Sequence, residues 1–452
     1  MRGAGMLLLA ACEQPTPSRQ PDSPRTGSSS TAPAPPGGSP ATRAPAPAAS
    51  APSLRGTTIS VLLAQSFVKG ADALFADLVK RDFEQQSGVM VNLETVDFNQ
   101  LQLKIAAAIQ SGKGVDLVQL FDLWPMTFAD SLADVSDVAA LVEKTWGGFY
   151  PQTKSSAQLR GSYIAVPHGI VGNSIVFREC WLKDVGYEKF PDDWTQFSDC
   201  ARKLRARGRP VGQSLGHSVG EPAAWAYPLL WSFGGKEVEQ DSRSVAINSR
   251  ETIESVKWMV QAWKEGFEEA GVGWDDASNN RAFLGQKISA TLNGPAIFWA
   301  ARGEGLPIWR DINHAPMPKG PAGRYHWHQT FSMGLLKQST NQEAAREFIR
   351  WMMSEHAFEP WFRLQEGYVL PPGPKFENHP AWTTGPKALQ PFRDVARYGR
   401  WPGFEGAASQ ASSNALGRYV VVDMYARAVL GEAPEAAVKW AEGEQQQIYS
   451  KA

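Results

Sequence analysis

Cysteine is scarce in this sequence, and no two cysteines stand close together. The 452 residues contain three, Cys12, Cys180 and Cys200. Because no C-x-x-C pair is present, zinc ribbons and thioredoxin-type redox motifs are excluded. No run of the body approaches the roughly 20 consecutive apolar residues of a membrane-spanning helix, so none is predicted there.

Net charge is almost absent as well. Forty-five Lys and Arg stand against 46 Asp and Glu, which gives a formal charge of -1. A chain without excess positive charge has no electrostatic attraction for nucleic acid or anionic lipid, so neither is an expected partner.

Catalytic signatures are also missing. The sequence contains no G-x-S-x-G elbow, H-E-x-x-H motif, P-loop or dinucleotide fingerprint, and no cofactor is predicted. A secreted glycan hydrolase stays open as an alternative, because it needs only two carboxylates about 5 to 9.5 Å apart. Asp122, Glu221 and Asp276 are the candidates for such a pair.

Aromatic residues, in contrast, are abundant: 17 Trp, 21 Phe and 10 Tyr. The face of an indole fits the C–H face of a pyranose ring, and its N–H donates to a hydroxyl. This composition favours sugar binding, although core packing is the better interpretation of any single Trp.

The first 12 residues, MRGAGMLLLAAC, resemble a bacterial lipoprotein signal with Leu9-Ala10-Ala11-Cys12 as its lipobox. Residues 13–56 are dominated by Pro, Ala, Ser, Thr and Gly, and such a segment is expected to be a disordered tether. The alternative is a chance match within a disordered N-terminus. The pattern predicts an exported protein that is held at the membrane only by a lipid on Cys12.

The globular body begins with alternating strand-like and helical patterns. Strands are expected over Thr58–Ala64, Val89–Val96 and Val115–Phe121, and helices over Ala71–Gln86 and Phe98–Ser111, with Gly112 as a stop. This β-α-β-α-β order predicts a parallel sheet covered by helices. Because such sheets bind ligands at the carboxyl ends of their strands, the candidate contacts are Gln65, Phe121, Asp122 and Trp124.

The stretch from Gly161 to Arg207 carries the most distinctive order of motifs. It reads G-x-Y-x-x-x-P (Gly161 to Pro167), then a strand, a helix ending in Gly, and P-x-x-W-x-x-F. This order resembles the extracellular solute-binding proteins of ABC importers, in the carbohydrate-binding branch related to maltose-binding protein. Residues 312–330 add "A-P-x-P-x-G-P-x-G", and residues 341–354 add a helix with the same resemblance.

The resemblance implies an α/β, two-lobed periplasmic-binding-protein fold of type II. Each lobe would be a mostly parallel sheet flanked by helices, with the ligand cleft between the lobes. Lobe 1 is expected to comprise residues 57–166 and 311–356, and lobe 2 residues 167–310 and 357–452. The family is not catalytic, and we expect a monomer.

The implied function is capture of a sugar or oligosaccharide outside the cytoplasmic membrane and delivery to an ABC importer permease by lobe closure. The protein would act in the periplasm or at the outer face of that membrane. A polyamine, a peptide or an opine-like compound is the alternative ligand on the same fold.

The chain beyond residue 167 offers further candidate ligand contacts. Glu221 would accept hydrogen bonds from sugar hydroxyls, with His217 beside it and Trp225 as a stacking face. Asn293, which precedes Gly294-Pro295, is the preferred second-lobe contact because an amide both donates and accepts. Helix capping and core packing are the competing interpretations. The remaining candidates are His168, Asn173, Asn280, Trp327 and Trp401.

Two further interpretations concern His and Cys. His326 and His328 share a face of a strand and could ligate a metal, but no second cluster supplies more ligands, so no metal is predicted. Cys180 and Cys200 lie on consecutive expected helices and form the candidate disulfide of an oxidising compartment.

Overall fold

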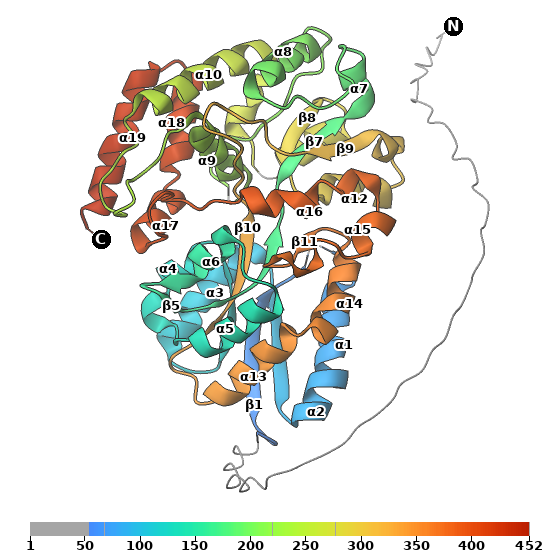
Figure 1. Cartoon of the computed structure of the whole chain (residues 1–452), viewed down its shortest axis with the longest axis vertical. Helices are drawn as coiled ribbons and strands as arrows, with labels where there is room; N and C mark the ends of the chain where they lie inside the picture. The colour runs from blue at the N-terminus through green and yellow to red at the C-terminus, as the bar shows by residue number, and fades with distance from the viewer. Residues whose placement is uncertain (1–53, 67, 219, 276, 452) are drawn as a thin grey trace, which may run out of the picture. The chain divides into compact units, whose positions relative to one another are not determined.

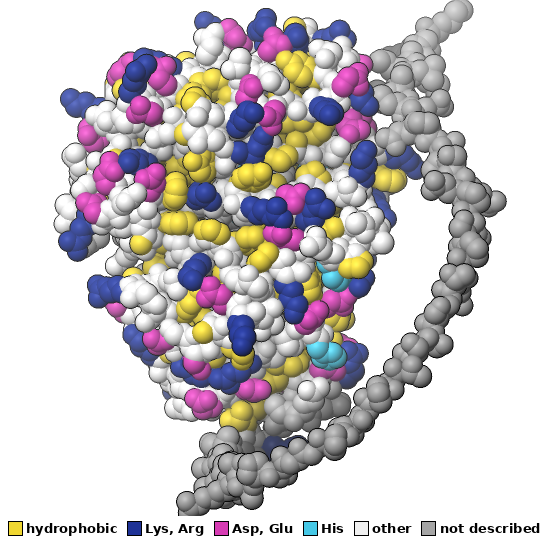
Figure 2. Space-filling view, in the orientation of Figure 1, with side chains coloured by type: hydrophobic (Ala, Val, Ile, Leu, Met, Phe, Trp, Pro, Cys, Tyr) yellow, Lys and Arg dark blue, Asp and Glu magenta, His cyan; other side chains and the backbone are white. Residues whose placement is uncertain are grey.

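The computed structural model describes residues 54–66, 68–218, 220–275 and 277–451 (Figure 1). The expected signal with Cys12, and nearly all of the expected tether, lie outside these residues. Within them, no helix combines the length and the apolar composition needed to cross a bilayer. Basic and acidic side chains are interspersed over the face shown in Figure 2, as the near-zero net charge leads one to expect.

The larger of two principal sheets has six strands in the order β11-β6-β10-β3-β1-β2. β1 is parallel to β2 and β3, whereas β10 is antiparallel to β3 and β6, and β11 is antiparallel to β6. The strands are β1 (Thr58–Ala64), β2 (Met90–Val96), β3 (Leu117–Phe121), β6 (Val166–Val171), β10 (Gln329–Leu335) and β11 (Val369–Leu370).

Helices flank this sheet in the lower half of Figure 1. They include α1 (Ala71–Leu78), α3 (Phe98–Ser111), α5 (Ser136–Thr145), α6 (Pro151–Ala157), α13 (Gln342–Met352) and α14 (Glu355–Gln365). The bounds expected for α3 are confirmed: the Asp97 side chain accepts from the N–H of Asn99, and Gly112 ends the helix with φ 70°. The helix expected from Ala71 continues through a π-helical turn to Gly88, which has φ 74°.

The smaller sheet has three strands in the order β8-β7-β9. They are β7 (Ser174–Arg178), β8 (Ala290–Asn293) and β9 (Ile312–Ala315), and both pairings are antiparallel. The α/β architecture is confirmed, but the expectation of a mostly parallel sheet in each lobe is wrong here. The central β7 runs antiparallel to both of its neighbours. β8 and β9, which α12 (Ala296–Gly303) connects, are parallel to each other but lie on opposite sides of β7.

Five long helices pack together beside the smaller sheet in the upper half of Figure 1. They are α8 (Trp194–Arg205), α9 (Glu221–Phe233), α10 (Arg250–Gly266), α18 (Val420–Val429) and α19 (Pro434–Tyr449). The expected cap of α8 is confirmed, because Asp193 accepts from the N–H of Gln196 at 2.8 Å. Its expected apolar face is buried: Trp194, Phe197, Ala201 and Leu204.

Three strands correct the ranges expected for the lobes. β6 belongs wholly to the larger sheet, so the boundary expected between residues 166 and 167 falls at the start of a strand. β9 lies in the smaller sheet and β11 in the larger one, each opposite to expectation. Pro167, which suggested a break, is accommodated because β10 shifts register between Phe331 and Ser332, opposite the proline. The other lobe boundaries stay predictions.

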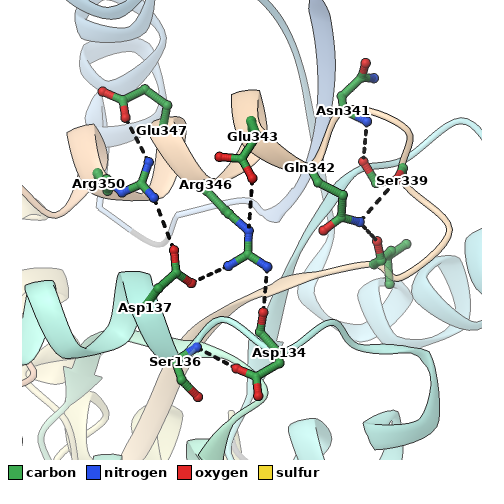
Figure 3. A network of polar contacts seen from close by, with 11 residues as sticks. Asp134, Ser136, Asp137, Ser339, Asn341, Gln342, Glu343, Arg346, Glu347 and Arg350 are labelled. Atoms are coloured by element: carbon green, nitrogen blue, oxygen red, sulfur yellow. Dashed lines mark hydrogen bonds and ion pairs between the residues drawn. The ribbon is translucent and has the colours of Figure 1, made fainter. Parts of the chain in front are cut away.

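Ion pairs fix α13 against α5 (Figure 3). The Arg346 guanidinium contacts the Asp137 carboxylate and donates to the backbone carbonyl of Asp134 at 2.6 Å. Arg350 bridges Asp137 at 3.2 Å and Glu347 at 3.1 Å. Arg346 is only 16% exposed, so this contact is screened less than an ordinary surface pair.

Gly169 lies in the middle of β6, where β11 approaches closely. A Cβ at this position would stand 2.7 Å from the Cγ1 atom of Val369. We therefore expect Gly169→Ala to lower the free energy of unfolding by about 1 to 3 kcal/mol, measured by urea denaturation. Gly443→Ala, in an α19 position with open space around it, should instead be neutral or stabilising by up to about 1 kcal/mol. Equal effects of the two substitutions would contradict this packing argument.

Candidate functional site

One edge of the larger sheet gathers polar and aromatic side chains from distant parts of the chain. Gln65 directly follows β1, and Asp122 directly follows β3. Because β10 and β11 run antiparallel to this direction, Phe331 and Tyr368 lie at their near ends, at the same edge. The expectation that the carboxyl ends of β1 and β3 form one wall is therefore matched in position, whereas ligand binding there stays a prediction.

Phe121 and Trp124, both expected at this wall, belong to one aromatic cluster. Phe98 lies 4.8 Å from Phe121 and 6.2 Å from Trp124 between ring centroids, and Phe121 lies 5.7 Å from Phe331. The His168 ring stacks on Phe331 with centroids 5.8 Å apart. Trp124 is partly exposed, so its ring remains accessible at this edge.

Asp122 has an unfavourable backbone conformation and a buried carboxyl group. Its backbone has φ 46°, in the left-handed region, and its side chain is almost completely buried. One carboxylate oxygen accepts from the backbone N–H of Thr330 at 2.9 Å, while Oδ2 has no hydrogen-bond partner among the described residues. Burial raises the pKa of this carboxyl well above its usual range.

Gln119, a residue of β3, joins His168 to the end of β1, a role that no motif in the sequence indicated. Its Oε1 accepts from the backbone N–H of Ala64 at 2.8 Å, and its Nε2 lies 3.4 Å from Nε2 of His168. Burial lowers the pKa of His168 to about 4, so the ring is neutral at pH 7.

Three of the predicted contacts, Glu221, Asn280 and Asn293, meet in one polar cluster, which Asn279 completes. The amide Nδ2 of Asn279 donates to Oε2 of Glu221, and Nδ2 of Asn293 donates to Oε1. Asn293 also donates to Oδ1 of Asn280 at 2.6 Å. Glu221 opens α9, Asn279 and Asn280 lie in α11 (Ser278–Leu284), and Asn293 ends β8. Alternating carboxylate and amide groups suit a ligand with several hydroxyls.

Tyr368 connects this polar cluster to the edge of the larger sheet. Burial, and then the negative charge of Glu221, raise the pKa of the Tyr368 phenol above its usual range. The strand pairings agree with this, because Val369, next to Tyr368, pairs with Val171, and Ser174, three residues after Val171, pairs with Asn293 of the cluster. The dipeptide Gly367-Tyr368 was visible in the sequence, but nothing there indicated its neighbours.

Asn173 and the His326-Trp327-His328 segment lie where the chain passes between the two sheets. The Asn173 N–H donates to Nδ1 of His328 at 3.0 Å, and the Asn173 carbonyl lies 3.0 Å from Nδ1 of His326. The Asn173 side chain donates to the carbonyl of Trp327 at 3.1 Å. These side chains join crossing segments to one another, and Trp327 is buried, which differs from the cleft positions expected for Asn173 and Trp327.

His326 and His328 both form hydrogen bonds with backbone groups. The N–H of Met317 donates to Nε2 of His326 at 3.1 Å, and Nε2 of His328 lies 2.9 Å from the carbonyl of Val395. In the part of the chain that the structure describes, no three His, Cys, Asp or Glu side chains gather as metal ligands.

Trp225 differs most from expectation. Its side chain is 0% exposed and packs among Trp194, Phe197 and Phe267, with ring centroids 5.5 to 6.1 Å away. The expectation that it forms a stacking face for a ligand is corrected: it belongs to the core beneath α9.

His217 and Trp401 lie apart from the Glu221 cluster. His217 pairs with the Asp423 carboxylate at 2.6 Å and stacks on Tyr419 with centroids 4.4 Å apart. Trp401 donates from Nε1 to the carbonyl of Gly406 at 2.8 Å and is partly exposed. Whether either side chain contacts a ligand stays a prediction.

The candidate disulfide is not formed. The Sγ of Cys180 donates to Oδ2 of Asp311 at 2.8 Å, whereas Cys200 is buried in the core with Trp194 and Phe197. Burial raises the pKa of the Cys200 thiol to about 12, which disfavours the thiolate needed for exchange.

A contact at the end of the helix that begins with Trp124 joins elements that pack against different sheets. The Thr127 hydroxyl, at the end of α4 (Trp124–Thr127), lies 2.9 Å from the Ser413 hydroxyl of α17 (Gln410–Gly417). α17 packs on α18 and α19, so the contact connects the aromatic edge to the helices of the smaller sheet.

Comparison with known proteins decides the family. The profile of the bacterial extracellular solute-binding proteins matches residues 65–357, well over half of the chain. The chain belongs to this family. A Brucella abortus protein named as a binding protein is 23% identical over 301 residues, which are 64% of this chain and 71% of that protein. A Deinococcus radiodurans protein named as an ABC transporter-binding protein is 24% identical over 254 residues, 53% of this chain and 58% of its own length.

A solved structure shares the fold. Maltose-bound MalE3 of T. maritima has a TM-score of 0.70 with 19% identity, covering 87% of this chain and all of that chain. The expected periplasmic-binding-protein fold of the maltose-binding-protein type is thereby confirmed. The family is one of solute-binding proteins, and the Deinococcus relative is named as a binding protein of an ABC transporter.

Four buried histidines give this solute-binding protein an expected acid sensitivity. Burial lowers the pKa of His168, His314 and His328 to about 4 and that of His326 well below its usual value. The unfolded chain, with His pKa values near 6.5, binds protons that the folded protein does not, so stability is lost as the pH falls from about 6.5 to 4.

Two buried carboxyls act in the opposite direction. Burial raises the pKa of Glu237 to about 7, so the folded state binds its proton first as the pH falls from 7, and Asp122 behaves alike. The four histidines outnumber the two carboxyls, so we expect the urea midpoint of unfolding to fall as the pH is lowered from 7 to 5. Glu237→Gln removes one of the opposing carboxyls and should make that fall steeper. A midpoint that rises on acidification would contradict the assignment of neutral buried histidines.

Proposed function

We propose that this solute-binding protein captures a sugar or oligosaccharide and delivers it to an ABC importer permease. The observation that carries the proposal is the meeting of Glu221, Asn280 and Asn293, three candidates drawn from separate parts of the sequence. Their carboxylate and amide groups offer several acceptors and donors to adjacent hydroxyls. The partly exposed Trp124 supplies an aromatic face of the kind a pyranose uses.

Delivery is proposed to follow from closure of the two lobes on the ligand. Groups of the larger sheet (Gln65, Trp124, Tyr368) and of the smaller sheet (Glu221, Asn293) would each hold part of one ligand. A ligand that contacts both sets stabilises the closed arrangement over the open one, and only this differential affinity can shift the equilibrium. The segments crossing at Asn173 and His328 are the natural place for the bend.

A thermal-shift screen of the full chain against mono- and oligosaccharides, polyols, polyamines, amino acids and short peptides tests the ligand class. At a hundredfold excess over its Kd, a ligand adds about 2.7 kcal/mol to the free energy of unfolding, an easily measured shift. A midpoint raised by one sugar class supports the proposal. A response only to cationic or amino-acid solutes would keep the fold and overturn the ligand assignment.

The lipid anchor is a separate part of the proposal. We propose that Cys12 carries the lipid and that the Pro- and Ala-rich segment after it lets the body reach the permease while it remains captive. Mass spectrometry of the mature N-terminus from a bacterial membrane fraction tests this. A mature chain that begins elsewhere, without lipid, would contradict it.

A further inference from the structure

A cavity lies directly beside the sheet edge that carries Gln65, His168 and Tyr368. It is bounded by α1, α14 and the strands β1, β6 and β10, and its volume is about 100 Å³. The part of the cavity wall that lies farther from this edge is apolar. Met333, two residues farther along β10 than Phe331, belongs to it. Its main apolar side chains are Phe75, Met333, Met352, Met353, Phe358 and Trp361.

Several polar groups of this cavity are already engaged by the protein itself. Both carboxylate oxygens of Asp72 accept from the backbone N–H of Ser66 at 3.1 Å. Oε1 of Gln119 accepts from the N–H of Ala64, and its Nε2 faces His168. The inner surface therefore offers an entering group mainly apolar contact, and the three methionines can adapt their shape to it.

Tyr368 ties the cavity to the polar cluster around Glu221. Tyr368 and Val369 line the cavity, and Val369 pairs with Val171 of β6. Ser174, three residues after Val171, pairs with Asn293 of the polar cluster. A single ligand could thus place hydroxyls at Glu221 and Asn293 while another part of it extends past Tyr368 between α1 and α14.

We propose that the solute is a glycoside whose small apolar aglycone, an aryl or short alkyl group, enters this cavity. The inference rests on the proposed function, because it takes the sugar to be bound at the Glu221 cluster. An apolar cavity of roughly 150 Å³ in another protein holds benzene. Since the cavity here is smaller, at about 100 Å³, the largest group it can hold is a single ring or a chain of about four to six carbons.

Calorimetric titration of the full chain with methyl and phenyl glycosides of glucose, galactose and xylose tests the inference. We expect the phenyl form of the preferred sugar to bind about tenfold more tightly than the methyl form, a usual gain for one apolar group in a matching pocket. Ala357→Leu adds bulk to the cavity wall and should remove this gain while leaving the Kd of the methyl glycoside within about twofold. Ala107→Leu, on the exposed face of α3, is the matched control and should keep the gain.

A second measurement separates this inference from the proposed function. Phenol alone should shift the methyl NMR signals of Met333, Met352 and Met353 in the wild type and not in Ala357→Leu; Ala64→Leu, at the same cavity, replaces that variant if it does not fold. Phenol binding without any glycoside binding would overturn both the sugar assignment and the inference that depends on it. Equal affinity for methyl and phenyl glycosides, or methionine signals unmoved by phenol, would overturn the inference and leave sugar capture intact.

Discussion

Replacing Glu221 by alanine is expected to weaken ligand binding by about 100-fold. The side chain is almost buried and accepts from Asn279 through one oxygen and from Asn293 through the other. Its removal takes away the acceptor for ligand hydroxyls and leaves both amides without their partner, and a lost charged hydrogen bond costs about 1.5 to 3 kcal/mol. Titration calorimetry with the solute found in the thermal-shift screen measures the change in Kd.

Two variants accompany this substitution. Glu221→Gln keeps the shape but replaces an accepting oxygen by a donor, so we expect an intermediate loss of about tenfold with the fold intact. Glu269→Ala removes a carboxylate that is 76% exposed and should leave the Kd unchanged. An unchanged Kd in Glu221→Ala would show that the polar cluster is not part of the ligand site.

Replacing Trp225 by alanine is expected to act on stability and not on affinity. The indole is fully buried against Trp194, Phe197 and Phe267, and truncation of a large aromatic core residue costs about 3 to 5 kcal/mol. Urea denaturation should show this loss, while the protein that remains folded binds its solute with the wild-type Kd.

Trp440→Ala provides the comparison for Trp225→Ala. Trp440 lies on α19, is partly exposed and has the Arg427 guanidinium 4.6 Å above its ring centroid. Removing this side chain should lower the free energy of unfolding by less than half as much as Trp225→Ala does. A weakened Kd in Trp225→Ala without loss of stability would restore the stacking role that the sequence had indicated.

Local signals in the sequence predicted the elements well. Asp97 and Gly112 delimit α3, and Asp193 caps α8, because these residues act on backbone groups within one turn. The Glu221, Asn280 and Asn293 candidates came from motif resemblance, and the structure brings them together over 72 residues of sequence. Gln119 and Tyr368 could not be found in this way, since their partners lie far from them in the chain.

Trp225 shows where a signal was present and weighed wrongly. Helix α9 reads EPAAWAYPLLWSF, apolar on every side, and a helix of that kind is buried all round. Asn173 and Trp327 differ from expectation for another reason. The Asn173 side chain donates to the carbonyl of Trp327, 154 residues away in the chain, and the Trp327 side chain is buried. Spacing along a chain does not reveal such pairings.

The most direct measurement is a calorimetric titration of the wild type and Glu221→Ala with the sugar that raises the thermal midpoint. We expect binding of one sugar per wild-type chain, recovery of that sugar unchanged after long incubation, and no detectable heat in the variant at the same concentrations. Equal heats from both proteins would contradict the assignment of Glu221 to the ligand site. Conversion of the sugar to a product would show that the protein is a hydrolase and not a binding protein.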